Sequence, residues 1–162
     1  MKKSLLLSCL VLCSTATLAQ TYKGITTCEF DYDGFKFCSK TNIQKYKNAL
    51  ATKKPNFDEQ YILINVSSRS NIRYVALDTK TGIAYPLSDE IQGFKNSHGF
   101  LTGKPSSINY SLYNTDLCIE GSVSAYRNSY DNVKVCYSIQ KDASSPYGKD
   151  FNRVNMPKEI ND

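Results

Sequence analysis

Apolar and polar residues alternate most regularly between residues 117 and 139. Two runs there, LCIEGSV and VKVCYSI, place an apolar side chain at nearly every second position, which is typical of strands with one buried face. Polar residues separate the runs, and positions 124–130 are expected to form a turn outside the strand pairing. The pattern therefore predicts a β-hairpin, which is the strongest structural signal in the chain.

The same two runs specify how the strands pair. If Cys118 lies opposite Cys136, apolar residues meet apolar residues on one face, and Glu120 meets Lys134 on the other face as an opposite-charge pair. A shift by one residue would turn every side chain to the wrong face. We therefore predict this register, together with a disulfide between Cys118 and Cys136.

The other periodic segments predict one helix and several shorter strands. The helix is expected at Thr41–Ala51, with Thr41 as its N-cap and an apolar stripe through Ile43, Tyr46 and Leu50. Strands are expected at 60–67, 72–78, 83–87 and 108–113, and a single helical turn at 88–93. The predicted fold class is α+β, a mainly antiparallel sheet of about five to seven strands with one N-terminal helix.

A second pair of cysteines bounds the run CEFDYDGFKFC. A three-residue loop at 32–34, with the glycine in the left-handed conformation, places Cys28 opposite Cys38, whereas a two-residue Asp-Gly loop offsets them by one. Local pairing therefore predicts two disulfides, Cys28–Cys38 and Cys118–Cys136, each stabilising the fold by about 3 kcal/mol. Other connectivities are open. A zinc site is the alternative, but the closely spaced cysteine pairs that such sites use are absent.

Residues 1–19 have the pattern of a secretory signal peptide. Two lysines precede a short apolar run, and the sequence TLA is a small-x-small cleavage site. An N-terminal membrane anchor is the alternative. Cleavage would leave a single globular domain at 20–140, followed by a polar tail at 141–162. An even number of cysteines in an exported chain favours disulfides, so the expected location is periplasmic or secreted.

Charge excludes some classes of partner. Loss of the two lysines with the signal peptide lowers the formal net charge from +5 to +3, which is too mild to indicate nucleic acid binding. No later segment is apolar enough to predict a membrane span. A basic cluster formed by Lys45, Lys47, Lys53 and Lys54 is either an anion-binding face or a solvated helix flank.

Signatures of catalysis are weak. The single histidine, His98, lies in the irregular stretch 94–107, which also contains two phenylalanines. No G-x-S-x-G motif accompanies it, and no clustered ligands indicate a metal or a cofactor. The adjacent acids Asp58-Glu59 and Asp89-Glu90 are candidates for glycosidase-like carboxylates, although such pairs in loops are usually solvated.

One segment resembles a known group. The run PNFDEQYILI…RYVALDTKTGIAYPL is similar to a strand–turn–strand pattern, PNF followed by DxKTGxxYxL, in small exported bacterial proteins of uncharacterised function. The matching residues are Pro55, Asn56, Phe57, Tyr61, Asp78, Lys80, Thr81, Gly82, Tyr85 and Leu87. The chain departs from the group at 67–70, where related proteins often carry a Gly- and Cys-rich segment. The resemblance implies an exported β-rich domain and supplies no catalytic residues.

Binding is the function that these patterns favour. The candidate binding residues are Tyr126, Arg127 and Tyr130 in the hairpin turn, because tyrosine and arginine are enriched at protein–protein hot spots. We predict an exported protein-binding module, such as an inhibitor or immunity protein that occludes a hydrolase or toxin. Its partner is expected to be another protein. The alternatives are an envelope or surface structural protein that contacts glycans or proteins, and a hydrolase with an unrecognised site near His98.

Overall fold

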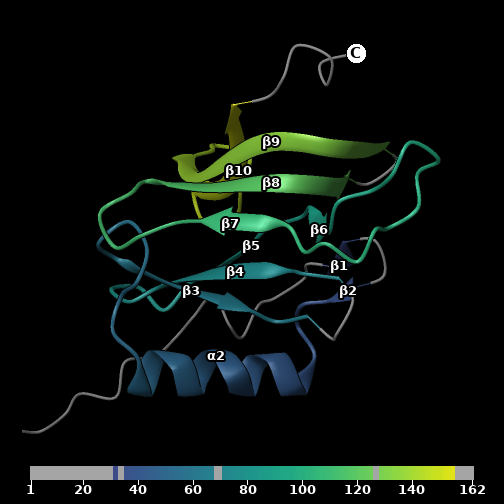
Figure 1. Cartoon of the computed structure of the whole chain (residues 1–162). Helices are drawn as coiled ribbons and strands as arrows, with labels where there is room; N and C mark the ends of the chain where they lie inside the picture. The colour runs from purple at the N-terminus through teal and green to yellow at the C-terminus, as the bar shows by residue number, and fades with distance from the viewer. Residues whose placement is uncertain (1–30, 33–34, 68–70, 126–127, 156–162) are drawn as a thin grey trace, which may run out of the picture.

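The computed structural model describes residues 31–32, 35–67, 71–125 and 128–155, and shows three layers (Figure 1). The only helix in these ranges, α2 (Lys40–Thr52), forms one outer layer. A small sheet forms the middle layer and a larger sheet forms the other outer layer. The small sheet has the order β3 (Tyr61–Asn65), β4 (Tyr74–Asp78), β5 (Ala84–Pro86).

The larger sheet is built on the long hairpin. Its order is β10 (Lys149–Asn155), β9 (Asn128–Lys141), β8 (Asp116–Ala125), β6 (Glu90–Gln92), and β7 (Ser107–Asn109) also pairs with β8. A separate short pair joins β1 (Asp31–Tyr32) to β2 (Phe35–Lys36). All of these pairings are antiparallel. The α+β class is therefore confirmed, but the strands form two stacked sheets rather than the single sheet expected.

The middle sheet is buried on both faces, which explains its almost continuous apolar sequence. On β3, Ile62 and Ile64 pack toward α2, while Tyr61 and Leu63 pack toward the larger sheet. Alternate residues of one strand therefore join two different cores. The predicted apolar face through Ile62 and Ile64 is confirmed, and the opposite face of the strand is buried as well.

Helix α2 begins one residue after Ser39. The Ser39 hydroxyl accepts a hydrogen bond from the N–H of Asn42 at 3.2 Å, so Ser39 is the N-cap and the prediction of Thr41 in this role is wrong. Tyr46 is buried under the helix, and its hydroxyl donates to the carbonyl of Phe37 at 2.8 Å. Pro55 follows soon after the helix ends and disfavours a further helical turn.

The segment with the PNF pattern protects the edge of the middle sheet. The Asn56 side-chain amide donates to the carbonyl of Leu63 at 3.2 Å and accepts from its N–H at 2.7 Å, in place of a neighbouring strand. The Phe57 side chain is fully buried. The turn after β4 forms as predicted, because Asp78 accepts backbone hydrogen bonds within it and Gly82 adopts a φ of 72°.

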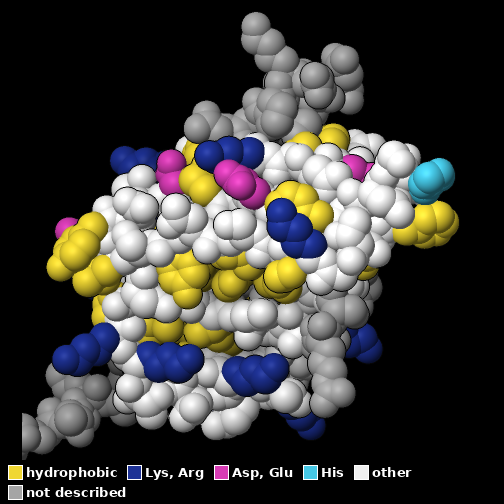
Figure 2. Space-filling view, viewed as in Figure 1, with side chains coloured by type: hydrophobic (Ala, Val, Ile, Leu, Met, Phe, Trp, Pro, Cys, Tyr) yellow, Lys and Arg dark blue, Asp and Glu magenta, His cyan; other side chains and the backbone are white. Residues whose placement is uncertain are grey.

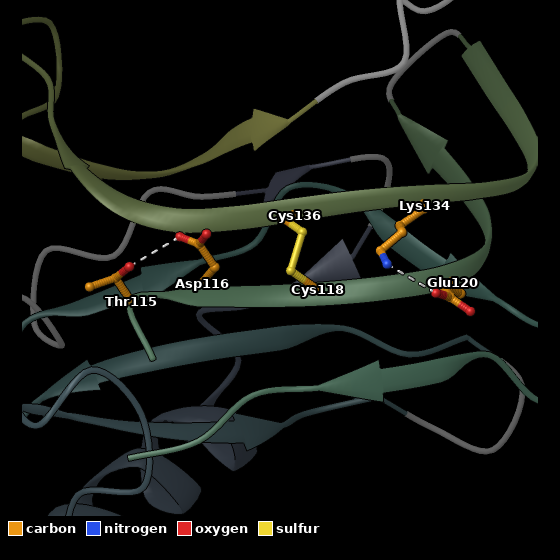
Figure 3. The surroundings of a disulfide bond; sticks show 6 residues. All are labelled: Thr115, Asp116, Cys118, Glu120, Lys134 and Cys136. Carbon is orange, nitrogen blue, oxygen red and sulfur yellow. Dashed lines mark hydrogen bonds and ion pairs between the residues drawn. A yellow bond between two sulfur atoms is a disulfide. The ribbon is translucent and has the colours of Figure 1, made fainter. Parts of the chain in front are cut away.

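The predicted hairpin register is confirmed, and Figure 3 shows its outer face. Cys118 pairs with Cys136 and is bonded to it by a disulfide. On the same face Lys134 lies 3.4 Å from Glu120. The expected turn at 124–130 is too long, however, because the ladder continues to the pair Ala125–Asn128. A bulge in β9 accommodates the extra residue and restores the pairing beyond it.

Two other segments differ from expectation. Residues 88–93 contain strand β6 instead of a helical turn, because Glu90–Gln92 pair with β8. Residues 149–155, expected in a polar tail, form β10 beside β9 and bury Phe151 in the core. The apolar residues of β10, the buried Phe151 and the half-buried Val154, are three positions apart among polar residues, which is too weak an alternation to predict a strand.

The N-terminal strand pair corrects the expected loop length. Tyr32 pairs with Phe35, which leaves two residues between the strands rather than three. Two-residue Asp-Gly connections match the twist of a hairpin, which accounts for this choice. Cys38 is disulfide-bonded, whereas Cys28 lies outside the described residues. The register argument for Cys28–Cys38, which required a three-residue loop, no longer holds, and the pairing stays a prediction.

Candidate protein-binding loop

Residues 94–104, called the 94–104 loop below, leave β6 and fold back on themselves before β7 (Figure 1). The N–H of Phe94 donates to the carbonyl of Lys104 at 2.9 Å. Further along, the N–H of Asn96 donates to the carbonyl of Phe100, also at 2.9 Å. The two arms are thus held together by backbone hydrogen bonds, although the sequence predicted an irregular segment.

The Asn96 side chain organises the tip of the loop. Its Oδ1 accepts hydrogen bonds from the N–H groups of His98 and Phe100, both at 3.0 Å. Gly99 adopts a φ of 79° and donates to the Asn96 carbonyl at 3.0 Å. A side chain at position 99 would be strained at this φ, so glycine is required for the reversal. The tip therefore has a defined backbone conformation.

The base of the loop is fixed to the bulge in β9. The N–H of Lys95 donates to Oδ1 of Asn132 at 2.8 Å, and Nδ2 of Asn132 donates to the Lys95 carbonyl at 2.8 Å. Asn132 has a φ of 56°, a conformation that asparagine tolerates better than most residues. The Lys95 ammonium also lies 2.6 Å from Asp131 and 3.0 Å from the Ser129 hydroxyl.

Gly93 allows the loop to close at its base. A Cβ atom at this position would clash with the carbonyl oxygen of Lys104, which is a backbone atom with little freedom to move. Only glycine permits this close approach. The 94–104 loop is thus held at its base and tip.

The loop presents apolar side chains to water. Phe100 and Leu101 are 70% and 55% exposed, and Tyr113 at 79% is the one other large hydrophobic residue of the described segments with comparable exposure. Figure 2 shows the single histidine at the edge of the molecule beside a hydrophobic side chain. Adjacent exposed apolar side chains on a fixed loop are typical of an interaction surface.

The structure describes only one of the three predicted binding residues. Tyr126 and Arg127 lie outside the described residues. Tyr130 is half-buried, and its ring centroid lies 5.8 Å from the guanidinium carbon of Arg153. The 94–104 loop is attached next to this end of the hairpin, because Lys95 contacts residues 129–132. The structure therefore brings the loop, which was not predicted as a binding site, beside the predicted turn.

A buried polar cluster lies on the inner side of the larger sheet. The Asp89 carboxylate accepts from the Tyr137 hydroxyl at 2.7 Å and from Nε of Arg153 at 2.6 Å. Burial raises the pKa of Tyr137 above its ordinary value, and the hydrogen bond to Asp89 raises the pKa of Arg153. The neighbouring Glu90 instead pairs with Arg73 at 3.0 Å. Because each acid has its own arginine, the cluster serves to join segments of the fold.

The surroundings of His98 offer little for catalysis. Its side chain is exposed, and Nδ1 lies 3.5 Å from the Ser97 hydroxyl. Among the described residues, no carboxylate is hydrogen-bonded to His98 and so none orients the ring. The same part of the chain contains no group of three or more histidine, cysteine, aspartate or glutamate residues able to hold a metal ion.

No protein-family model matches the chain, and no curated protein or solved structure matches it either. Within the described ranges, no helix is both long and apolar enough to cross a membrane.

Proposed function

We propose that the chain is an exported protein-binding module that inserts the 94–104 loop into a concave site of a partner protein. The observation that carries this proposal is the pair of exposed side chains, Phe100 and Leu101, on a loop whose base is joined to Asn132 by two hydrogen bonds. By this mechanism the module would act as an inhibitor or immunity protein that occludes a hydrolase or toxin.

The 94–104 loop meets two physical requirements of a segment that inserts into a partner's concave site. A loop already fixed in its bound conformation loses little conformational entropy on binding, so more of the contact energy becomes affinity. Burial of an aromatic side chain supplies that energy, at about 25 cal/mol per Å² of apolar surface removed from water. Phe100 is the natural anchor, with Leu101 beside it.

The candidate residues Tyr126, Arg127 and Tyr130 extend the proposed surface. The 94–104 loop is attached beside the end of the hairpin that carries them, so one partner would contact both segments. In this arrangement Phe100 and Leu101 enter the partner's cleft, and the hairpin turn contributes polar contacts at the rim.

Export is part of the proposal and is supported by two features. The signal-peptide pattern directs the chain out of the cytoplasm, and the Cys118–Cys136 disulfide is stable in oxidising compartments. A periplasmic or secreted location follows. The resemblance to small exported bacterial proteins agrees with this location and adds nothing about the partner.

The alternatives have less support. A surface protein that binds glycans through its tyrosines needs exposed rings, yet five tyrosines of the described segments are buried. They are Tyr46, Tyr61, Tyr74, Tyr85 and Tyr137. A hydrolase centred on His98 needs an acid to orient the imidazole, and the surroundings described above do not supply it.

Affinity capture with matched variants tests the proposal. The wild-type chain and the variant Phe100→Ser/Leu101→Ser are used as bait in extract from the producing cells, with Tyr113→Ser as a control that removes an equally exposed ring elsewhere. We expect one protein to be retained by wild type and Tyr113→Ser only, and wild type to inhibit the purified partner. Equal retention by all three baits would exclude the 94–104 loop as the binding element.

A further inference from the structure

The solvent-exposed surface of helix α2 is basic, with lysines on both of its flanks. The exposed lysines of this surface, called the α2 basic face below, are Lys40, Lys45, Lys47, Lys53 and Lys54. No aspartate or glutamate occurs between residues 35 and 57. Figure 2 shows Lys and Arg side chains along the side of the molecule that α2 occupies in Figure 1.

Within the described part of the chain, none of the five lysines of the α2 basic face takes part in an ion pair. Lys40 even lies in the first turn of α2, where the partial positive charge of the helix end disfavours a cation. Helix stability alone would not select this arrangement, so the charges point to an external anion.

Shallow hollows give anions access to these ammonium groups. Lys40 and Lys45 border one open hollow together with Gln44 and Asn48, whose side-chain amides are further donors. A second hollow, between Lys45, Lys53 and strand β3, lies on the flank of the helix. Phosphate groups would meet several donors in each hollow.

The chemistry of the face favours one class of partner. Its outward residues include no large apolar side chain to anchor a protein partner and no aromatic ring on which a nucleic acid base would stack. They include no arginine, so bidentate recognition of a single phosphate is absent. Lysines spread along a helix of about 20 Å match a plane of many phosphates better than one bound ion.

We infer that the α2 basic face docks on a phospholipid bilayer rich in anionic headgroups, by electrostatic adsorption without insertion. Helix α2 and the larger sheet are opposite outer layers of the fold (Figure 1). The 94–104 loop belongs to the larger sheet, so docking through α2 leaves Phe100 and Leu101 free to bind a partner. This inference does not depend on the proposed function of that loop.

Vesicle co-sedimentation of the full-length chain tests the inference. The vesicles consist either of phosphatidylcholine alone or of phosphatidylcholine with about one-third phosphatidylglycerol, and salt is varied from about 0.05 to about 0.5 M. We expect binding only to the anionic vesicles and its loss at the higher salt. Neutralising Lys40, Lys45 and Lys47 together as Lys→Gln should weaken binding by about 100-fold, since each lysine contributes about fivefold.

Two control variants make the result specific. Lys80→Gln/Lys134→Gln/Lys141→Gln has the same change in net charge on other exposed lysines, and Lys→Arg at positions 40, 45 and 47 conserves the charge. Both should bind like wild type. Equal loss in the Lys80/Lys134/Lys141 variant, absence of binding to anionic vesicles, or binding to duplex DNA without binding to vesicles would each overturn the inference.

Discussion

Asn132 is joined to Lys95 by two hydrogen bonds of 2.8 Å, in which its side-chain amide takes the place of a neighbouring strand. The same arrangement occurs between Asn56 and Leu63 at the edge of the middle sheet. In both places an asparagine satisfies one N–H and one carbonyl group that have no strand beside them. At Lys95 the consequence is a projecting loop with a fixed base.

The variant Asn132→Gly should release the 94–104 loop. Glycine accepts the φ of 56° without strain, so the change removes the two side-chain hydrogen bonds and little else. We expect faster amide hydrogen exchange at Lys95 and Asn96, with a global loss of stability of about 1–2 kcal/mol. Asn132→Asp keeps the acceptor for the Lys95 N–H and should be intermediate. Unchanged exchange at Lys95 in Asn132→Gly would show that the base is fixed by other contacts.

The variant Asp89→Asn should destabilise the fold. It removes the charge that pairs with Arg153 and leaves the guanidinium without its partner carboxylate. We expect chemical denaturation to show a decrease of about 2–3 kcal/mol in the free energy of unfolding. This decrease is smaller than the cost of breaking a fully buried ion pair, because part of Arg153 reaches water. Glu120→Gln breaks an exposed pair with Lys134 and should cost less than about 1 kcal/mol. Equal effects of the two changes would contradict this account.

Buried tyrosines should make the fold sensitive to alkali. Burial raises the pKa of Tyr46 above its ordinary value, and it raises the pKa values of Tyr61 and Tyr85 to about 12. In the unfolded chain these groups ionise at about pH 10. Above that pH the unfolded state binds fewer protons than the folded state, so the free energy of unfolding falls as pH rises.

Tyr46→Phe measures this effect at one site. The variant should reduce the fall in the free energy of unfolding above about pH 10 by up to about 1.4 kcal/mol per pH unit. It should also cost about 1 kcal/mol at neutral pH, because the hydrogen bond to the Phe37 carbonyl is lost. Tyr113→Phe changes an exposed residue and should leave the profile unaltered. Denaturation midpoints at a series of pH values decide between these outcomes.

The Cys118–Cys136 disulfide should stabilise the fold but should not be needed to set the pairing of β8 with β9. Replacing both cysteines by alanine should lower the free energy of unfolding by about 3 kcal/mol, given the sequence separation of 18. The strand pairing should remain, because the apolar pairs on the inner face specify it. Mass spectrometry of the unreduced digest tests the second bridge, and recovery of a peptide that joins Cys28 to a residue other than Cys38 would exclude it.

Strong local patterns made much of the fold predictable. The hairpin register followed from alternation and one charge pair, and the helix followed from its apolar stripe. Stacking of two sheets was not predictable, because a strand buried on both faces has a continuous apolar sequence that does not say what covers each face. Strand β10 was missed because its two apolar residues, Phe151 and Val154, are three positions apart among polar residues and do not alternate.

The candidate site was less predictable than the fold. Glycines marked residues 94–107 as irregular, and of the two phenylalanines in this stretch Phe100 is exposed whereas Phe94 is half-buried. The contacts that fix the loop, from Lys95 to Asn132, join residues 37 positions apart. A short-range sequence pattern cannot predict a contact at that separation. Sequence composition instead drew attention to Tyr126, Arg127 and Tyr130 in the neighbouring turn.

Site-specific photocrosslinking in the producing cells tests the central claim, that the 94–104 loop binds a partner protein. A photoreactive amino acid replaces Phe100 in one variant and Tyr113 in a second variant, which controls for exposure alone. We predict a discrete crosslinked protein from position 100 that Asn132→Gly weakens and that position 113 does not produce. The same adducts from both positions, or none from position 100, would contradict the claim.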